Sequence, residues 1–201
     1  MLFDVDGVLL DSIPAYQRAW RTWADEYGIS EDSIWATAHG RRPIDIIRLC
    51  APLVNERAAV RRFEELIGVE YEWVPAMTGA SDVLERISAA WAVVTSGSHA
   101  LVQRAFRRLH LPVPRVWVDG ADVAVGKPDP ACYRLAAHRL ELDPRACVVV
   151  EDAPNGVAAG KAAGMTVIAL RTTHALGQLH QADLVVPSLH DVADAVSRLI
   201  G

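Results

Sequence analysis

The chain has 201 residues, of which 51% are hydrophobic and 22% are charged, and its formal net charge at pH 7 is -5. This length is enough for one domain with a modest insertion, and this hydrophobic content excludes a disordered chain. The acidic balance and the absence of a long charge run argue against nucleic acid as a partner. No apolar run reaches the length of a membrane span, so we expect no membrane partner either.

The N-terminus lacks the basic region and the cleavage site of a signal peptide, and the three cysteines form no C-x-x-C pair. Both features predict a cytoplasmic protein with reduced thiols, which we expect to be a monomer or a weak dimer. Only three residues precede Asp4, which is fewer than a central strand usually has. We therefore expect a start that is trimmed or misplaced.

Short apolar runs rich in β-branched residues alternate with helical segments along most of the chain. The runs are typical of buried parallel strands, and they span 1–5, 91–95, 116–118, 147–150, 166–170 and 184–186. The helical segments span 80–89, 98–109, 130–140, 155–163 and 189–200. This alternation predicts an α/β fold in which helices cover a doubly wound parallel sheet.

Residues 13–78 interrupt the alternation, because they contain no convincing strand and carry apolar residues such as Ala19 and Trp23 at helical spacing. We therefore predict a core formed by 1–12 and 79–201. The all-helical segment would form a small separate domain over one end of the sheet.

Polar groups follow four of the predicted strands, at the edge where parallel strands end and where ligands of such sheets bind. In chain order these groups are Asp4 and Asp6, then Ser96 and Gly97, then Lys127, and then Glu151 and Asp152. Each group alone also fits a solvated turn or a helix cap. Four of them at one edge indicate a site, and Lys127 adds weight because the chain has only one other lysine, Lys161.

The spacing of Asp4 and Asp6 points to the chemistry of this site. Residues two apart in a strand point the same way, and two neighbouring carboxylates repel unless a cation or a reaction uses them. Acidic groups from two strands can hold Mg²⁺, while a hydroxyl, backbone N–H groups and a lysine can bind a phosphate. One carboxylate then remains as a nucleophile and another as a proton donor.

With these motifs the chain resembles the haloacid dehalogenase superfamily of phosphotransferases over its whole length. The matching stretches are FDVDGVLLDS (3–12), VTSGS (94–98), GKPDP (126–130) and VVEDAPNGVAAGKAAG (149–164). The helical insertion resembles the type-one cap of this family. Within the family the chain is most similar to sugar phosphatases and to glycerol-phosphate and 2-deoxyglucose-6-phosphate phosphatases.

The resemblance implies a phosphomonoester hydrolase that acts on a small sugar or polyol phosphate through an aspartyl-phosphate. Asp4 would attack the phosphorus. Asp6 would protonate the leaving oxygen and then activate water. Ser96 and the amide of Gly97 would hold the phosphoryl oxygens, and Lys127 would neutralise their charge.

The resemblance also implies a Mg²⁺ cofactor. The ion would be held by Asp4, the carbonyl of Asp6 and Asp152, with Glu151 nearby or ligating.

The substrate would be recognised by a loop of the cap. The family's substrate-reading loop corresponds to His39, Gly40, Arg41 and Arg42. An arginine there can meet hydroxyls or a second anionic group, and we expect Arg42 in particular to choose the substrate. A solvated basic turn before the helix near Pro43 is the alternative.

Other activities of this fold fit the sequence less well. Dehalogenases use a single aspartate, so Asp6 argues against that activity, and phosphonate hydrolases need a cap lysine, which 13–78 lacks. The main alternative is a mutase similar to β-phosphoglucomutase. Such mutases place a histidine after the first motif, where this chain has Tyr16, and they also need a cap lysine. A non-catalytic binding module would require the loss of a catalytic residue, and none is lost.

Overall fold

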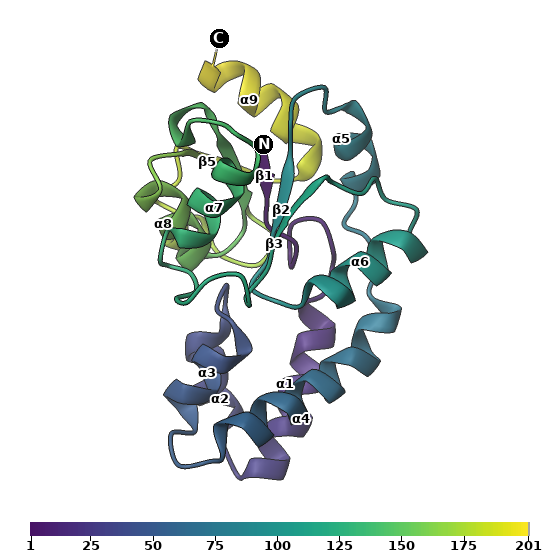
Figure 1. Cartoon of the computed structure of the whole chain (residues 1–201), viewed down its shortest axis with the longest axis vertical. Coiled ribbons are helices and arrows are strands. Elements are labelled where there is room, and N and C mark those ends of the chain that lie inside the picture. The colour runs from purple at the N-terminus through teal and green to yellow at the C-terminus, as the bar shows by residue number, and fades with distance from the viewer. Residues whose placement is uncertain (201) are drawn as a thin grey trace.

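The computed structural model describes residues 1–200 and contains a six-stranded parallel sheet (Figure 1). The strands are β1 (Leu2–Phe3), β2 (Ala92–Val94), β3 (Val116–Val118), β4 (Val148–Glu151), β5 (Thr166–Leu170) and β6 (Leu184–Val186). Their order is β3-β2-β1-β4-β5-β6, and every neighbouring pair is parallel. The predicted fold class is confirmed. The order reverses between β1 and β4, which is where sheets of this kind bind ligands.

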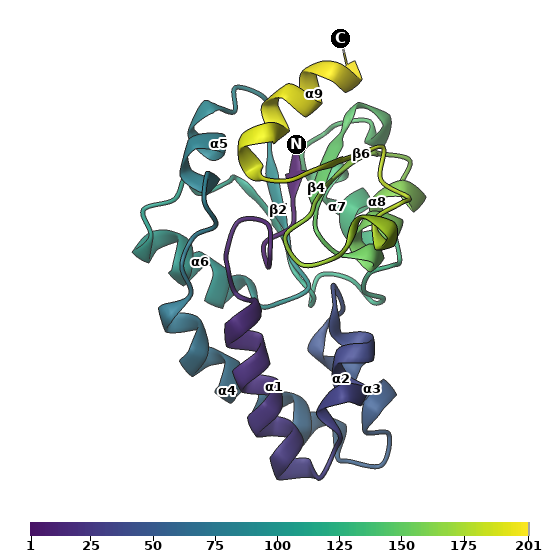
Figure 2. The ribbon, with the colours of Figure 1, turned by 180° about the vertical axis from the view of Figure 1, so that it is seen from behind.

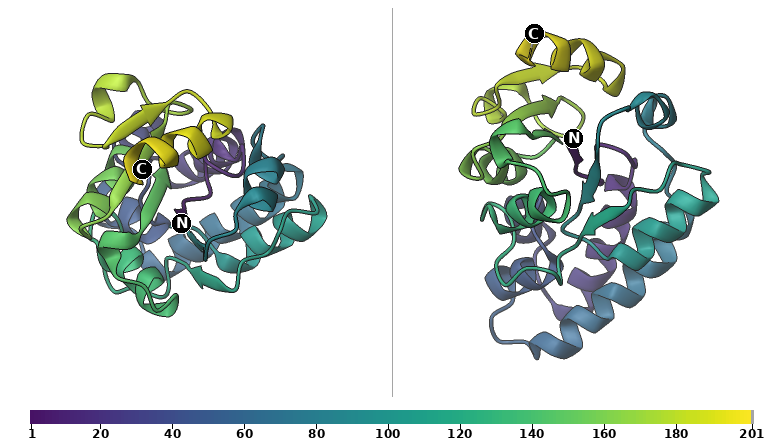
Figure 3. Two further views of the ribbon diagram at one scale, coloured as in Figure 1. Left: turned by 90° about the horizontal axis from the view of Figure 1, so that it is seen from above. Right: turned by 45° about the horizontal axis from the view of Figure 1, so that its top comes forward.

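Helices cover both faces of the sheet, as is usual for parallel strands. They are α5 (Ala80–Arg86), α6 (His99–Arg108), α7 (Ala131–Arg139), α8 (Pro154–Ala162) and α9 (Val192–Ile200). Alternate strand residues face opposite sides. Leu2 packs in a hydrophobic cluster with α7 and α8, whereas Phe3 packs in a second cluster with α5, α6 and α9. Figure 3 shows helices on both sides of the sheet.

Between β1 and β2 the chain forms a helical insertion beside the carboxyl ends of the strands (Figures 1 and 2). Its helices are α1 (Ile13–Tyr27), α2 (Glu31–Ala38), α3 (Pro43–Cys50) and α4 (Glu56–Glu70), followed by a 3₁₀ turn (Tyr71–Trp73). Further 3₁₀ turns span Pro144–Ala146, Leu176–Gln178 and Leu189–Asp191. Within residues 1–200, no helix has both the length and the hydropathy needed to cross a membrane. The division into two domains remains a prediction.

Aromatic packing holds the two longest helices of the insertion together. The rings of Trp20 and Phe63 stack with centroids 3.8 Å apart, and both side chains are buried. The indole Nε1 of Trp23 donates to the carbonyl of Ala59 at 3.0 Å, so this buried donor is satisfied. These contacts join α1 to α4. Tyr16 lies on α1 and Tyr71 directly follows α4, so the same packing places both tyrosines beside Asp6.

The first strand is shorter than the predicted run 1–5, because the chain turns sharply after Asp4. The carbonyl of Val5 accepts hydrogen bonds from the amides of the turn that follows, at 2.8–3.1 Å. Gly7 completes the turn at φ +82°, and a Cβ there would lie only 2.3 Å from Asp152 Oδ2. Only glycine fits this position, which explains the glycine after the paired aspartates. The sharp turn also separates the side chains of Asp4 and Asp6, which therefore contact different partners.

Candidate active site

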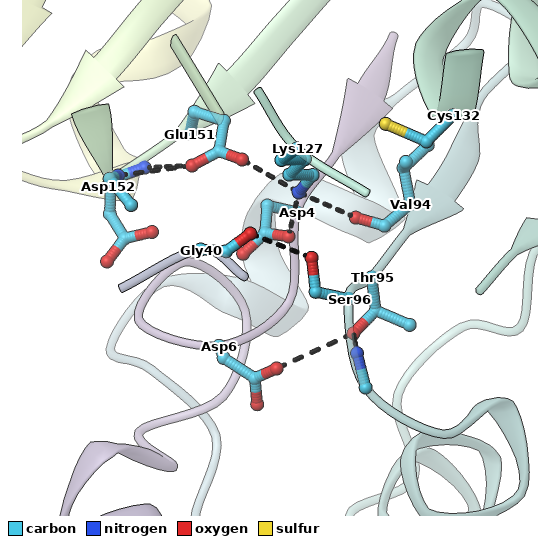
Figure 4. A network of polar contacts seen from close by, with 12 residues as sticks. Asp4, Asp6, Gly40, Val94, Thr95, Ser96, Lys127, Cys132, Glu151 and Asp152 are labelled. Carbon is cyan, nitrogen blue, oxygen red and sulfur yellow. Dashed lines mark hydrogen bonds and ion pairs between the residues drawn. The ribbon is translucent and has the colours of Figure 1, made fainter. Parts of the chain in front are cut away.

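Four buried side chains meet at the carboxyl ends of β1 and β4 (Figure 4); they are Asp4, Lys127, Glu151 and Asp152. The ammonium of Lys127 joins the group. Its Nζ donates to Asp4 Oδ1 at 2.5 Å, to Glu151 Oε1 at 2.8 Å and to the carbonyl of Val94 at 3.4 Å. All three ammonium protons are therefore used, and the lysine is held against Asp4 from two sides.

Glu151 acts as the support of this lysine. Its Oε1 accepts hydrogen bonds from Lys127 and from the hydroxyl of Tyr133 at 2.9 Å. Its Oε2 accepts from the amides of Asp152 and Ala153 at 2.9 and 3.1 Å. Burial alone would raise the pKa of Glu151, but the ammonium and these hydrogen bonds bring it below its ordinary value. Each of its two oxygens therefore already accepts two hydrogen bonds in this structure.

A glycine in the helix after β4 leaves space for the Glu151 carboxylate. A Cβ on Gly156, in the first turn of α8, would lie 1.6 Å from Glu151 Oε1. The glycine of the "PNGV" stretch is therefore required by the buried carboxylate beside it.

The group contains three carboxyl groups and only one ammonium, so its carboxyl groups cannot all ionise without leaving surplus negative charge. Asp4, Glu151 and Asp152 each offer a carboxylate oxygen, and these oxygens lie within 4.8 Å of one another around one ammonium. Burial raises the pKa of Asp4 to about 8, although Lys127 opposes the rise. Burial and the charges of Glu151 and Asp4 raise the pKa of Asp152 well above its ordinary value. Surplus charge on hard oxygen donors is the condition that a bound Mg²⁺ relieves, so the residues present fit this ion.

Asp6 lies apart from this group, and its partners are Ser12, two tyrosines of the insertion and Thr95, which follows β2. Its Oδ1 accepts hydrogen bonds from the hydroxyls of Ser12 at 2.6 Å and Tyr71 at 2.8 Å. Its Oδ2 lies 3.5 Å from the hydroxyls of both Tyr16 and Thr95. Burial raises the pKa of Asp6, while the hydrogen bonds limit the rise. A carboxyl with a raised pKa can hold a proton near neutral pH and donate it.

Ser96 and Gly97 follow β2 and face the insertion. The hydroxyl of Ser96 donates to the carbonyl of Gly40 at 2.9 Å (Figure 4), and the amide of Gly97 donates to Thr95 Oγ1 at 3.0 Å. Both residues line a cavity of about 60 Å³ together with Asp4 and Asp6.

The loop between α2 and α3 closes this cavity from the insertion side. The carbonyl of His39 accepts a hydrogen bond from Asn155 Nδ2 at 2.8 Å, and the ring of His39 lies edge-on to that of His174 with centroids 4.5 Å apart. Arg41 lines the cavity, and its buried Nε has no hydrogen-bond partner among the described residues.

Arg42 differs from the sequence-based expectation. Its side chain is 9% exposed, and the guanidinium donates to both carboxylate oxygens of Asp45 and to the carbonyls of Gly120, Val123 and Ala124. A guanidinium has five N–H donors, and all five are used. Neither the substrate-reading role nor the solvated turn fits Arg42, because the side chain is buried and has no donor left for a substrate.

Sequence reasoning missed the residues that support the predicted ones. Tyr71 contacts Asp6 across 65 positions, and Tyr133 contacts Glu151 across 18. A lone tyrosine in a helical segment carries no motif, so no local signal pointed to either residue.

Comparisons with known proteins agree with this geometry. The model of the haloacid dehalogenase-like hydrolase family matches residues 1–164. Hexitol phosphatase A of Escherichia coli is 40% identical over 197 residues, covering 95% of this chain and 91% of that protein. Glycerol-1-phosphate phosphohydrolase 2 of Saccharomyces cerevisiae is 35% identical over 200 residues, covering 92% and 80%. The crystal structure of CbbY from Rhodobacter sphaeroides in complex with phosphate is similar with a TM-score of 0.76 at 26% identity, covering 93% and 92%. The chain therefore belongs to the haloacid dehalogenase-like hydrolases.

Proposed function

We propose that this protein is a Mg²⁺-dependent phosphatase that hydrolyses a small sugar or polyol phosphate through an aspartyl-phosphate on Asp4. Residues 1–12 and 79–201 would form its catalytic core, and 13–78 would form its cap. The observation that carries the proposal is the buried Lys127, which is held between Asp4 and Glu151 at 2.5 and 2.8 Å. A nucleophilic carboxylate with a fixed cation beside it is prepared for a phosphoryl group.

The two aspartates have different surroundings, and this supports different roles. Oδ1 of Asp4 is bound to Lys127, which leaves Oδ2 to attack the phosphorus. The Asp4 O–P bond forms as the bond from phosphorus to the leaving oxygen breaks, and Asp6 gives its proton to that oxygen. Asp6 then takes a proton from water, which attacks the phosphorus and releases phosphate and free Asp4.

The metal ligands in this proposal are Asp4, Asp152 and the carbonyl of Asp6. A bound Mg²⁺ supplies positive charge that offsets the negative charge of the phosphate and of the two carboxylates. Asp152 is held in place by the hydroxyl of Thr173, which donates to its carboxylate. Glu151 stays behind Lys127 and keeps that ammonium in position.

Ser96 and the amide of Gly97 would bind phosphoryl oxygens in the cavity that they line. The Ser96 hydroxyl has one proton, which Gly40 accepts in this structure. A phosphate would compete with the Gly40 carbonyl for that proton, and a charged acceptor makes the stronger hydrogen bond.

The cap residues His39, Gly40 and Arg41 would recognise the leaving group. Arg41 is the arginine of this loop with a free donor, since the donors of Arg42 are taken. A guanidinium fork matches neighbouring hydroxyls or an anionic end, which suits a polyol or sugar. The names of the hexitol and glycerol-1-phosphate relatives support this substrate class.

The mutase alternative has less support. The hydroxyl of Tyr16 lies 3.5 Å from Asp6 Oδ2, at the position where a mutase would need its histidine, and residues 13–78 contain no lysine. Both findings favour hydrolysis over transfer back to the sugar.

A substrate panel tests the proposal. Purified protein with Mg²⁺ would be assayed for phosphate release from hexitol phosphates, glycerol 1-phosphate, 2-deoxyglucose 6-phosphate and p-nitrophenyl phosphate. The matched control is Asp4→Asn, which keeps the shape of the side chain but removes the nucleophile, and we expect a loss of about a thousandfold or more. Phosphate release by Asp4→Asn at a tenth of the wild-type rate, or an isomerised sugar phosphate as product, would contradict the proposal.

A further inference from the structure

We propose that Arg42 is a positioning residue: it clasps the core segment 120–126 when the cap is closed and so holds Lys127, the next residue, against Asp4. This inference rests on the proposed function and adds a coupling between cap closure and the catalytic lysine. Arg42 belongs to the cap, at the start of α3, whereas its three carbonyl acceptors belong to the core.

Arg42 donates more hydrogen bonds to the core than the other residues of this loop exchange with it. Nη1 donates to the carbonyls of Gly120 at 3.2 Å and Val123 at 2.7 Å, and Nη2 donates to that of Ala124 at 3.1 Å. The carboxylate of Asp45 orients the guanidinium from the cap side, with distances of 2.6 and 2.9 Å. The other cap–core hydrogen bonds of this loop, to Gly40 and to His39, use one donor each.

The core segment is shaped around this guanidinium. A Cβ on Gly126 would lie 2.7 Å from Arg42 Nε and 2.9 Å from Asp45 Oδ2. A Cβ on Gly120 would lie 3.2 Å from the Cγ and Cδ of Arg42. The backbone of Gly126 does not have a positive φ, so the lack of a side chain there serves the approach of the arginine and not the conformation of the chain.

The segment leads directly into the catalytic group. Three backbone carbonyls between Gly120 and Gly126 accept hydrogen bonds from this one side chain of the cap, and Lys127 follows at once with its ammonium 2.5 Å from Asp4. When the cap opens, those three carbonyls lose the Arg42 donors, and the backbone that leads into Lys127 keeps only its core contacts, such as the hydrogen bonds from Arg139 to Asp122. Lys127 is then complete as a catalytic group only in the closed state, in which water is also excluded.

Kinetics on two substrates separate this role from substrate recognition. The enzymes are wild type, Arg42→Ala and, as matched control, Arg57→Ala, which removes an exposed arginine on α4 of the same insertion. The substrates are p-nitrophenyl phosphate and sorbitol 6-phosphate. We expect Arg42→Ala to lower kcat for both substrates by a similar factor, on the order of a hundredfold, with little change in KM and no change for Arg57→Ala. A loss confined to sorbitol 6-phosphate would overturn the proposal, because Arg42 would then read the leaving group.

A double-mutant cycle with Gly126→Ala tests whether Gly126 is needed for the close approach of Arg42. In the wild type the added Cβ meets Arg42 and Asp45, so Gly126→Ala should reduce kcat for p-nitrophenyl phosphate nearly as much as Arg42→Ala does. In the Arg42→Ala background the contact with the guanidinium is gone and Asp45, which has lost its partner, can turn away, so adding Gly126→Ala should cost less than about threefold more. Additive losses in the double variant would overturn the proposal.

Hydrogen exchange tests the clasp without relying on activity, so it remains decisive if the proposed function fails. In Arg42→Ala the amides of 120–126 should exchange at least about tenfold faster, while those of β4 and β5 keep their protection. If Arg42→Ala does not fold, Arg42→Lys replaces it, since lysine cannot reach two carboxylate oxygens and three carbonyls at once. Unchanged exchange in 120–126 would overturn the proposal whatever the kinetics show.

Discussion

The carboxyl group of Asp6 shows how strongly a single residue in this protein depends on distant partners. Ser12 lies six positions away in the chain and Tyr71 lies 65 positions away, yet both donate to the same oxygen, Oδ1. This arrangement directs Oδ2 toward Tyr16 and Thr95 at the cavity. Because the two hydrogen bonds stabilise the charged form, they set how far burial can raise the pKa of Asp6.

Replacement of Tyr71 by phenylalanine should shift the pH profile. The variant loses a hydrogen bond that lowers the pKa of Asp6, so that pKa should rise further. The first step needs protonated Asp6, and kcat/KM therefore falls at pH values above this pKa. We expect this basic limb to move to higher pH in Tyr71→Phe, as measured by pH–rate profiles with p-nitrophenyl phosphate.

A matched control for this shift is Tyr27→Phe, on the same insertion but stacked on Trp23. Its profile should coincide with that of the wild type. A basic limb that stays in place or moves to lower pH in Tyr71→Phe would show that Tyr71 does not tune Asp6.

At the level of secondary-structure elements, the carboxylate of Asp183 joins α8, β5 and the turn before β6. Asp183 accepts two hydrogen bonds from Lys161 Nζ, at 2.6 and 2.8 Å, and one from the amide of Val167 at 2.7 Å. Burial alone would raise the pKa of Asp183, but these hydrogen bonds bring it below its ordinary value. The hydrogen bonds of Asp183 therefore stabilise the folded state by an amount that depends on pH.

Asp183→Asn should reveal that term. A lowered pKa in the folded state stabilises the protein above the unfolded pKa, and the gain is lost as the pH falls through the folded value. At pH 7 we expect Tm to fall by about 2–4 °C, which corresponds to about 1 kcal/mol for a partly exposed, charged hydrogen bond. The difference between the variant and the wild type should shrink on acidification below about pH 4. Thermal melts at several pH values measure these Tm differences, with Asp25→Asn, an exposed residue on α1, as the control variant. A Tm difference between Asp183→Asn and the wild type that does not depend on pH would contradict the prediction.

The packing of α1 on α4 depends on a stacked aromatic pair. Trp20 is 1% exposed and lies against Phe63, so Trp20→Ala removes a large buried surface and leaves a cavity. We expect a loss of about 3–5 kcal/mol in the free energy of unfolding, measured by urea denaturation. Trp73 is 80% exposed and serves as the control, with an expected change below about 0.5 kcal/mol for Trp73→Ala. Equal losses in the two variants would contradict this account of the insertion.

For the molecule as a whole, the site lies where two parts of the chain close on each other. The core supplies the carboxylates and Lys127, while the insertion supplies Tyr16, Tyr71 and the 39–42 loop that closes the cavity. Three carboxylates around one ammonium leave surplus negative charge in a buried place. A charge of this kind destabilises the closed molecule unless a cation offsets it.

Mg²⁺ should therefore stabilise the whole protein as well as activate it. We expect Tm to rise with Mg²⁺ concentration, because the ion binds the folded state only, and activity to disappear in EDTA and return with added Mg²⁺. In Asp152→Asn both effects should be strongly reduced, since a proposed ligand is lost. Full activity in EDTA, or the same gain in Tm in the variant, would refute the metal assignment.

Much of this molecule could be predicted from local patterns in the sequence. Apolar runs of the right length predict strands, their alternation with helices predicts a parallel sheet, and such a sheet brings its strand ends to one edge. The convergence of Asp4, Lys127 and Asp152 follows from that topology. These features are predictable because each depends on a residue's place within its own strand or turn.

The partners of those residues could not be predicted, because they depend on how the insertion packs on the core. The pattern "HGRR" led us to expect Arg42 in particular at the substrate, yet Arg41 reaches the cavity and Arg42 reaches backbone carbonyls some 80 positions later in the chain. The support of Glu151 by Tyr133 is likewise a contact between separate elements. Adjacent side chains at the start of a helix point in different directions, and the surface that each one meets is set by the angle between two packed units.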